Sequence, residues 1–167
     1  MQPGTLQIFT TGGTIDKTYF DEKSVYEVGE PQITAILREA NVTARYAVEK
    51  LFRKDSLDLT DADRAEIVRR VREASAHRVL VTHGTDTMVR TAWALEEVER
   101  KTIVLVGSLN PARFKESDAV FNVGFALAAV QTLPPGVYIA MNGQVLDPEH
   151  ARKNRKENRF EGVNSEG

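Results

Sequence analysis

Residues 79–87, with the sequence VLVTHGTDT, decide the fold, because an apolar run leads directly into a polar loop there. An amphipathic helical pattern follows over residues 88–95. Apolar runs also lead into Gly-containing loops at residues 6–15 and 103–111. Strands that are apolar throughout and alternate with helices are typical of a parallel sheet that is covered on both faces. We therefore expect an α/β fold, a three-layer α/β/α sandwich with a mainly parallel central sheet.

The composition is that of one compact domain without a polyanionic partner. The chain has 167 residues, a length typical of a single domain, and we expect residues 1–167 to form one. Its 24 acidic and 22 basic residues nearly balance, which argues against binding nucleic acid through bulk charge. There is no cysteine, which excludes disulfides and thiolate metal sites. No apolar stretch approaches the roughly 20 residues of a membrane-spanning helix, so we expect a soluble, cytoplasmic protein without a membrane partner.

The remaining elements follow from periodicity and from turn and cap signals. Apolar residues at helical spacing follow Pro31, which suits a first helical turn, and Thr60 with Asp63 resembles a capping box. Residues 16–29 carry Asp, Lys, Thr, Ser and Gly without a clear period and are long for a simple connection, which suits a functional loop. We also expect strands over residues 45–51, 137–140 and 144–146, the last after an Asn142-Gly143 turn, and a helix over residues 118–131 capped by Ser117.

In a parallel sheet, ligands bind beyond the carboxyl ends of the strands, so the loops after the apolar runs are the candidate sites. Residues 10–15, TTGGTI, place two glycines where the backbone can approach a ligand closely, or where a tight turn leads into a helix capped by Thr14. In the loop 83–87, Thr85 or Asp86 can cap a helix, and Asp86 can also bind a substrate ammonium. Neither loop has a nucleotide-binding pattern.

Two further features have an ordinary interpretation. His77, His83 and His150 lack metal-ligand spacing, and we interpret His83 as structural. Residues 152–156, RKNRK, are typical of a solvated tail. The functional alternative is that one lysine of this run folds back to the cleft.

Together these stretches closely resemble the bacterial-type L-asparaginase family. The family combines a TGGTI loop, here residues 11–15, with an HGTDT loop, here within the longer match at residues 81–91. Further similarity lies at Asp55-Ser56, at residues 106–108 and at residues 141–146. The resemblance covers residues 6–160 and implies the fold of the family's N-terminal domain. A typical member is about twice as long and has a C-terminal domain, so this chain resembles a short, single-domain form.

The resemblance also implies the residues of the site. Thr14, the second threonine of TGGTI, is the expected nucleophile, and a tyrosine on the following loop approaches it, for which Tyr19 is preferred over Tyr26. Thr85 would position or activate water with Lys153 hydrogen-bonded to it. The substrate would be bound by the remaining residues of the motifs, Ser56 for the α-carboxylate and Asp86 for the α-ammonium, together with Asp55 and Gly84.

The implied reaction is hydrolysis of L-asparagine to L-aspartate and ammonia through an acyl-threonine intermediate. It needs no cofactor and no metal, and the partner is a small molecule rather than a nucleic acid. Two alternatives stay open: glutamine hydrolysis that supplies ammonia, and a non-catalytic amino-acid-binding domain. The helix expected over residues 118–131 is apolar nearly all round, which predicts burial on more than one side and assembly as a homodimer or homotetramer.

Overall fold

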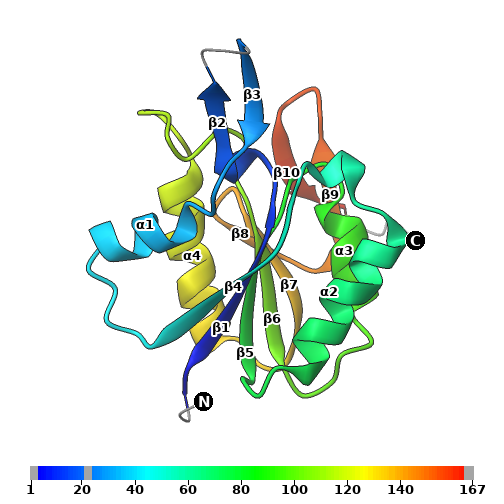
Figure 1. The fold of residues 1–167 in the computed structure, drawn as a ribbon. Coiled ribbons are helices and arrows are strands. Elements are labelled where there is room, and N and C mark those ends of the chain that lie inside the picture. The colour runs from blue at the N-terminus through cyan, green and yellow to red at the C-terminus, as the bar shows by residue number, and fades with distance from the viewer. Residues whose placement is uncertain (1–3, 21–23, 164–167) are drawn as a thin grey trace.

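The computed structural model of the chain describes residues 4–20 and 24–163, and its centre is a mainly parallel sheet (Figure 1). Within these residues the strand order is β4-β1-β5-β6-β7-β8, with β8 antiparallel to β7 and the other neighbours parallel. The strands are β1 (Leu6–Gly12), β4 (Tyr46–Lys54), β5 (Arg78–Thr82), β6 (Thr102–Val106), β7 (Gly136–Met141) and β8 (Gln144–Leu146).

Helices cover both faces of the sheet. The helices α1 (Ile33–Glu39) and α4 (Ala119–Thr132) lie on one face, and α2 (Asp61–Glu73) and α3 (Met88–Leu95) lie on the other (Figure 1). The described part of the chain also has three single turns of 3-10 helix: η1 (Thr14–Asp16), η2 (Ser56–Asp58) and η3 (Pro148–His150). The expected three-layer α/β/α sandwich is therefore confirmed.

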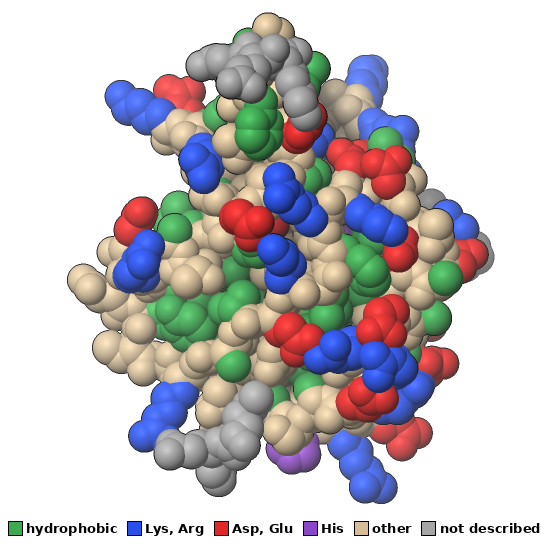
Figure 2. Space-filling model, viewed as in Figure 1, with side chains coloured by type: hydrophobic (Ala, Val, Ile, Leu, Met, Phe, Trp, Pro, Cys, Tyr) green, Lys and Arg blue, Asp and Glu red, His purple; other side chains and the backbone are tan. Residues whose placement is uncertain are grey.

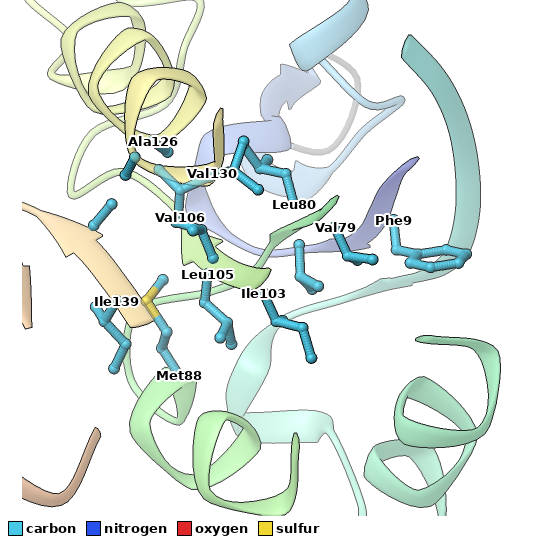
Figure 3. Close-up of a cluster of buried hydrophobic side chains, with 14 of the residues drawn as sticks. Phe9, Val79, Leu80, Met88, Ile103, Leu105, Val106, Ala126, Val130 and Ile139 are labelled. Atoms are coloured by element: carbon cyan, nitrogen blue, oxygen red, sulfur yellow. The ribbon is translucent and has the colours of Figure 1, made fainter. Parts of the chain in front are cut away.

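Burial on both faces explains why the central strands are apolar without alternation. Side chains that are adjacent along a strand point to opposite faces, and both faces are dry. Val79 lies on the side of α2 and α3, whereas Leu80 points toward Val130 of α4 (Figure 3). Both side chains are almost completely buried.

The helix termini largely follow the sequence signals. Thr60 accepts a hydrogen bond from Asp63 N, and the Asp63 carboxylate accepts one from Thr60 N, which confirms the capping box at α2. At the start of α4, Ser117 Oγ accepts from Ala119 N, but the N-cap residue is Asp118 rather than the expected Ser117. Pro31 precedes α1 rather than forming part of its first turn, since the helix is capped at Gln32.

Two hairpins stand at the carboxyl edge of the sheet, and the sequence did not indicate either of them (Figure 1). The first, β2 (Lys17–Phe20) with β3 (Val25–Val28), lies in the stretch expected to be a loop. The second, β9 (Ala151–Asn154) with β10 (Arg159–Gly162), replaces the expected solvated tail. Their strands have only four residues each, which is too short to produce a clear alternating pattern.

Within the described residues of this single chain, only one of the two apolar faces of helix α4 is covered. Ala126 and Val130 pack on the sheet (Figure 3), but Val120 and Phe121 on the outer face are 58% and 63% exposed. Phe121 stacks on Phe125 with ring centroids 6.3 Å apart. Burial of the outer face, which was expected to come from a second subunit, therefore stays a prediction.

The charged surface is mixed. Figure 2 shows side chains of both signs spread over the visible face rather than gathered by sign. None of the helices in the described residues is long and apolar enough to cross a membrane.

Candidate functional site

Three loops at the carboxyl edge of the sheet are packed backbone to backbone. A Cβ atom added to Gly13 would lie 2.5 Å from the Cα and N atoms of Gly84, and one added to Gly84 would lie 2.6 Å from Ser56 Cβ. Such distances are too short for any side chain at either position. Glycine at 13 and 84 therefore lets the loops after β1, β4 and β5 meet in one place.

The first loop presents Thr14 at the start of η1. Thr11 Oγ1 donates to the carbonyl of Thr82 over 2.9 Å, which ties the end of β1 to the end of β5. Gly13 follows with a φ of 90° and caps η1. No side chain caps η1, so the alternative of Thr14 as a capping residue is wrong. The Thr14 side chain is half-buried, and no hydrogen bond of its hydroxyl is recorded among the described residues.

The second loop meets Lys153 of β9. Lys153 Nζ donates to Thr85 Oγ1 over 2.8 Å and to Asp86 Oδ1 over 2.9 Å, and only 15% of the lysine side chain is exposed. These residues are 67 and 68 positions apart in the chain. The alternative that one lysine of the basic run folds back to the cleft is therefore correct. Neither Thr85 nor Asp86 caps α3, which begins after Thr87 without a side-chain cap.

The third loop is η2, which carries Asp55 and Ser56. Asp55 accepts a hydrogen bond from Leu57 N over 3.2 Å and pairs with Lys17 at 3.0 Å. Burial acts to raise the pKa of Asp55, but the Lys17 ammonium and the backbone N–H of Leu57 outweigh it and hold the pKa below its usual value. Ser56 Oγ is buried and has no hydrogen-bond partner among the described residues. Because Thr87 Oγ1 donates to Ser56 O over 2.8 Å, this loop is fixed to the second.

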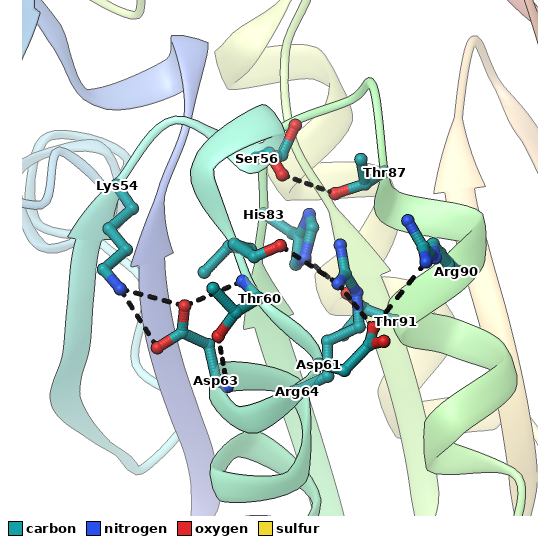
Figure 4. Close-up of polar contacts among 11 residues, drawn as sticks. Lys54, Ser56, Thr60, Asp61, Asp63, Arg64, His83, Thr87, Arg90 and Thr91 are labelled. Atoms are coloured by element: carbon teal, nitrogen blue, oxygen red, sulfur yellow. Dashed lines mark hydrogen bonds and ion pairs between the residues drawn. The ribbon is translucent and has the colours of Figure 1, made fainter.

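His83 lies fully buried behind the second loop, next to Arg64 of α2 (Figure 4). Its Nδ1 is 2.7 Å from the carbonyl of Gly84, and its Nε2 is 2.7 Å from Thr91 Oγ1. Burial lowers the pKa of His83 to about 4, the Arg64 charge acts in the same direction, and the hydrogen bond to Gly84 opposes both. The ring is therefore neutral at pH 7. Since a carbonyl only accepts, Nδ1 carries the proton and Nε2 accepts from the Thr91 hydroxyl.

The two candidate tyrosines face each other across the first hairpin. Tyr19 of β2 pairs with Tyr26 of β3, and their ring centroids are 5.2 Å apart. Tyr26 also contacts Phe114 edge to face, at 5.7 Å. Among the described residues no recorded hydrogen bond joins either tyrosine to Thr14. The structure thus holds Tyr19 on the hairpin next to Tyr26, and its approach to Thr14 stays a prediction.

Asp16 is a buried acid that the sequence did not single out. Its Oδ1 accepts from Gln32 N over 2.8 Å and its backbone carbonyl accepts from Gly29 N over 2.6 Å, so it joins both ends of the hairpin segment. Its Oδ2 is buried without a partner among the described residues. Burial raises the pKa of Asp16 to about 7, which the hydrogen bond from Gln32 opposes and the charge of Glu30 increases.

This raised pKa predicts a pH-dependent stability that Asp16→Asn removes. Between about pH 4 and pH 7 the native state binds a proton at Asp16 that the unfolded chain has lost, so wild-type stability falls as the pH rises through this range and then levels off. At about 1.4 kcal/mol per pKa unit, the loss has an upper bound of roughly 4 kcal/mol. Urea unfolding of both proteins at pH 4.5, 6 and 8 measures it. The prediction would be contradicted if the free energy of unfolding of the wild type and of Asp16→Asn changed with pH by the same amount.

Two residues near the site were not predicted from the sequence. Lys17 pairs with Asp55, and Arg155 Nη2 lies 3.6 Å from Asp86 Oδ1. Potential metal ligands gather elsewhere: in the described part of the chain, Asp147, Glu149 and His150 have ligand atoms within 4.8 Å of one another, and all three are exposed. They belong to none of the three loops.

Comparison with known proteins explains the convergence of these loops. The family model described as "Asparaginase, N-terminal" matches residues 5–166. The chain belongs to the asparaginase family. A solved structure of the thermostable L-asparaginase from Thermococcus kodakarensis superposes with a TM-score of 0.83 at 27% identity, over 96% of this chain and 51% of the other. The resemblance inferred from the motifs is therefore confirmed.

Two curated relatives show the range of the asparaginase family. A probable periplasmic L-asparaginase of Haemophilus influenzae is 29% identical, over 89% of this chain and 46% of its own length. A component of the glutamyl-tRNA(Gln) amidotransferase of Methanococcus vannielii is 32% identical, over 85% of this chain and 35% of its own length. The chain thus spans about half or less of the length of these relatives. Since one of them is named as periplasmic, a cytoplasmic location stays a prediction.

Proposed function

We propose that the chain is an amidohydrolase that converts L-asparagine to L-aspartate and ammonia through a covalent ester on Thr14. The observation that carries the proposal is the pair of hydrogen bonds from Lys153 to Thr85 and Asp86, at 2.8 and 2.9 Å, beside the loop of Thr14. A lysine, a hydroxyl and a carboxylate in contact can move a proton and hold an ammonium, which are the tasks that this hydrolysis requires.

In the first half of the reaction, the Thr14 hydroxyl attacks the side-chain amide of the substrate. The tetrahedral intermediate collapses, its nitrogen takes up the proton that Thr14 lost and leaves as ammonia, and a β-aspartyl ester remains on Thr14. A threonine hydroxyl is a weak nucleophile and needs a neighbouring group to accept its proton. Tyr19 of the hairpin is the candidate for this task, and closure of the hairpin over the site would bring it to Thr14.

In the second half, water hydrolyses the ester. Thr85 Oγ1 would orient the attacking water, with the Lys153 ammonium holding the threonine hydroxyl by a hydrogen bond, and the proton that the water loses would end on the departing Thr14 oxygen. Asp86 would bind the α-ammonium of the substrate, and the unpartnered hydroxyl of Ser56 would bind the α-carboxylate. Asp55 positions Ser56 through the cap of η2.

His83 has a supporting role in this scheme. Its Nδ1–H donates to the carbonyl of Gly84, and in a trans peptide the following N–H, that of Thr85, points to the opposite side. This N–H is therefore directed away from the buried histidine and is a suitable donor to an oxyanion. One such donor contributes about 3 kcal/mol to the stabilisation of the transition state.

The experiment that tests the proposal is ammonia release from L-asparagine and L-glutamine, measured side by side over a range of concentrations. The proposal expects turnover of asparagine in excess over glutamine. Turnover of glutamine in excess would favour the supply of ammonia for transfer, the role suggested by the name of the Methanococcus vannielii relative. Thermal stabilisation by asparagine without ammonia release would favour a non-catalytic amino-acid-binding domain.

We also propose that the protein assembles as a homodimer or homotetramer in the cytoplasm. The outer face of α4 has no charged side chain and exposes Val120 and Phe121, so a second copy could cover it. Light scattering at low micromolar concentration is expected to give at least twice the mass of one chain. A mass of one chain would contradict the assembly.

A further inference from the structure

The second hairpin brings a second cation to Asp86. Arg155 Nη2 lies 3.6 Å from Asp86 Oδ1, the same oxygen that Lys153 contacts at 2.9 Å. In the part of the chain that the structure describes, no group donates a hydrogen bond to Asp86 Oδ2. The carboxylate thus has two positive neighbours on one side and a free oxygen on the other.

Arg155 differs from the other arginines of this hairpin. Arg152 and Arg159 both pair with Glu161, at 3.2 and 3.0 Å, and are engaged within the hairpin. The backbone next to Arg155 is fixed, because Asn154 Oδ1 accepts from two N–H groups of the turn, each over 3.1 Å. The side chain of Arg155 is 71% exposed, so it can change its conformation while its backbone stays in place.

The charge balance at Asp86 indicates what Arg155 does when substrate enters. An ammonium bound to Asp86 would be the third cation around one carboxylate, next to Lys153 and Arg155, and like charges at this distance repel. An amino acid also brings an α-carboxylate, attached to the carbon that carries the ammonium. A guanidinium that moves from Asp86 to this carboxylate relieves the repulsion and forms a bidentate pair.

The groups around η2 do not supply such a cation. Ser56 offers a hydroxyl, but Asp55 and Asp58 beside it are acidic, and Lys17 is paired with Asp55. A carboxylate held only at η2 would therefore lie next to negative charges. We infer that Arg155 is a substrate-binding residue that holds Asp86 in the free protein and takes the α-carboxylate of the bound amino acid, an inference that rests on the proposed function.

The test compares Arg155→Gln with Arg152→Gln, a matched loss of one exposed arginine from the same hairpin. Arg155→Gln is expected to raise the KM for L-asparagine about 10- to 100-fold with kcat changed less than about threefold, whereas Arg152→Gln leaves both within about twofold. Arg155→Lys keeps the charge but not the bidentate geometry and is expected to lie between. Inhibition by L-aspartate is expected to weaken in parallel, but inhibition by β-alanine, which is aspartate without its α-carboxylate, is expected not to weaken.

Three results would overturn the inference: unchanged KM in Arg155→Gln, an equal loss in Arg152→Gln, or an equal weakening of L-aspartate and β-alanine. A wild-type protein that releases no ammonia would instead contradict the proposed function. Calorimetric binding of L-aspartate and β-alanine to the same variants then decides on Arg155 separately. A wild type that neither hydrolyses asparagine nor binds aspartate would overturn both proposals.

Discussion

Thr14→Ala is expected to lower kcat for L-asparagine by at least roughly 10⁴-fold, because the other hydroxyl of the TGGTI loop, that of Thr11, is buried and donates to Thr82 O. The half-buried hydroxyl makes no recorded hydrogen bond and caps no helix. We therefore expect the free energy of unfolding to change by less than about 0.5 kcal/mol. Loss of activity without loss of stability would separate chemistry from folding. Ammonia release and urea unfolding, measured on the same preparations, test both halves of the prediction.

Thr10→Ala is the matched control for this variant. Thr10 lies four residues earlier on β1, and its buried hydroxyl also lacks a hydrogen-bond partner among the described residues. The substitution removes the same atoms but lies within β1 rather than in η1, so activity is expected to stay within about threefold of wild type. A Thr14→Ala protein that keeps more than a tenth of wild-type kcat would contradict the nucleophile assignment. Equal losses in both variants would point to a structural cause.

The sheet could be predicted from the sequence because its strands are buried on both faces. Residues 103–106 and 79–82 have no polar side chain other than a threonine. Such a short apolar run is typical of a strand that is buried on both faces of a parallel sheet. The two hairpins could not be predicted. Their strands have only four residues each, and their positions depend on contacts with distant loops. Tyr19 and Tyr26 could not be distinguished for the same reason, since they are partners across one hairpin.

The site was predicted from motifs rather than from physical reasoning on the chain. Local signals identified Gly13 and Asp86 as unusual, but they did not indicate that Gly13 packs on Gly84 or that Lys153 reaches Asp86. Contacts between residues so far apart in the sequence follow from the fold. Arg155 was missed because a run of basic residues in a sequence indicates a positive charge but does not indicate which acidic groups these residues contact. Asp16 was missed because a single aspartate in a polar stretch looks exposed.

Lys153→Met is expected to lower kcat roughly 10²- to 10⁴-fold, through the second half of the reaction. Ammonia leaves during formation of the ester, before the step that the Thr85–Lys153 pair is proposed to assist. The variant should therefore release about one ammonia per site rapidly and then turn over slowly, while aspartate appears only at the slow rate. Rapid-quench measurement of both products tests this order. Lys156→Met, in the exposed turn of the same hairpin, is the control and is expected to show no such burst.

Thr85→Val combined with Lys153→Met tests whether the two residues act as one unit. Because the Thr85 hydroxyl and the Lys153 ammonium share one hydrogen bond of 2.8 Å, either substitution removes the same contact that is proposed to orient the water. The double variant is then expected to be no more than a few-fold slower than the slower single variant, far from the product of the two losses. Additive losses would mean that Lys153 acts through Asp86 alone, as a holder of the acid that binds the substrate ammonium. In that case its removal would raise KM rather than lower kcat, and the burst of ammonia would disappear.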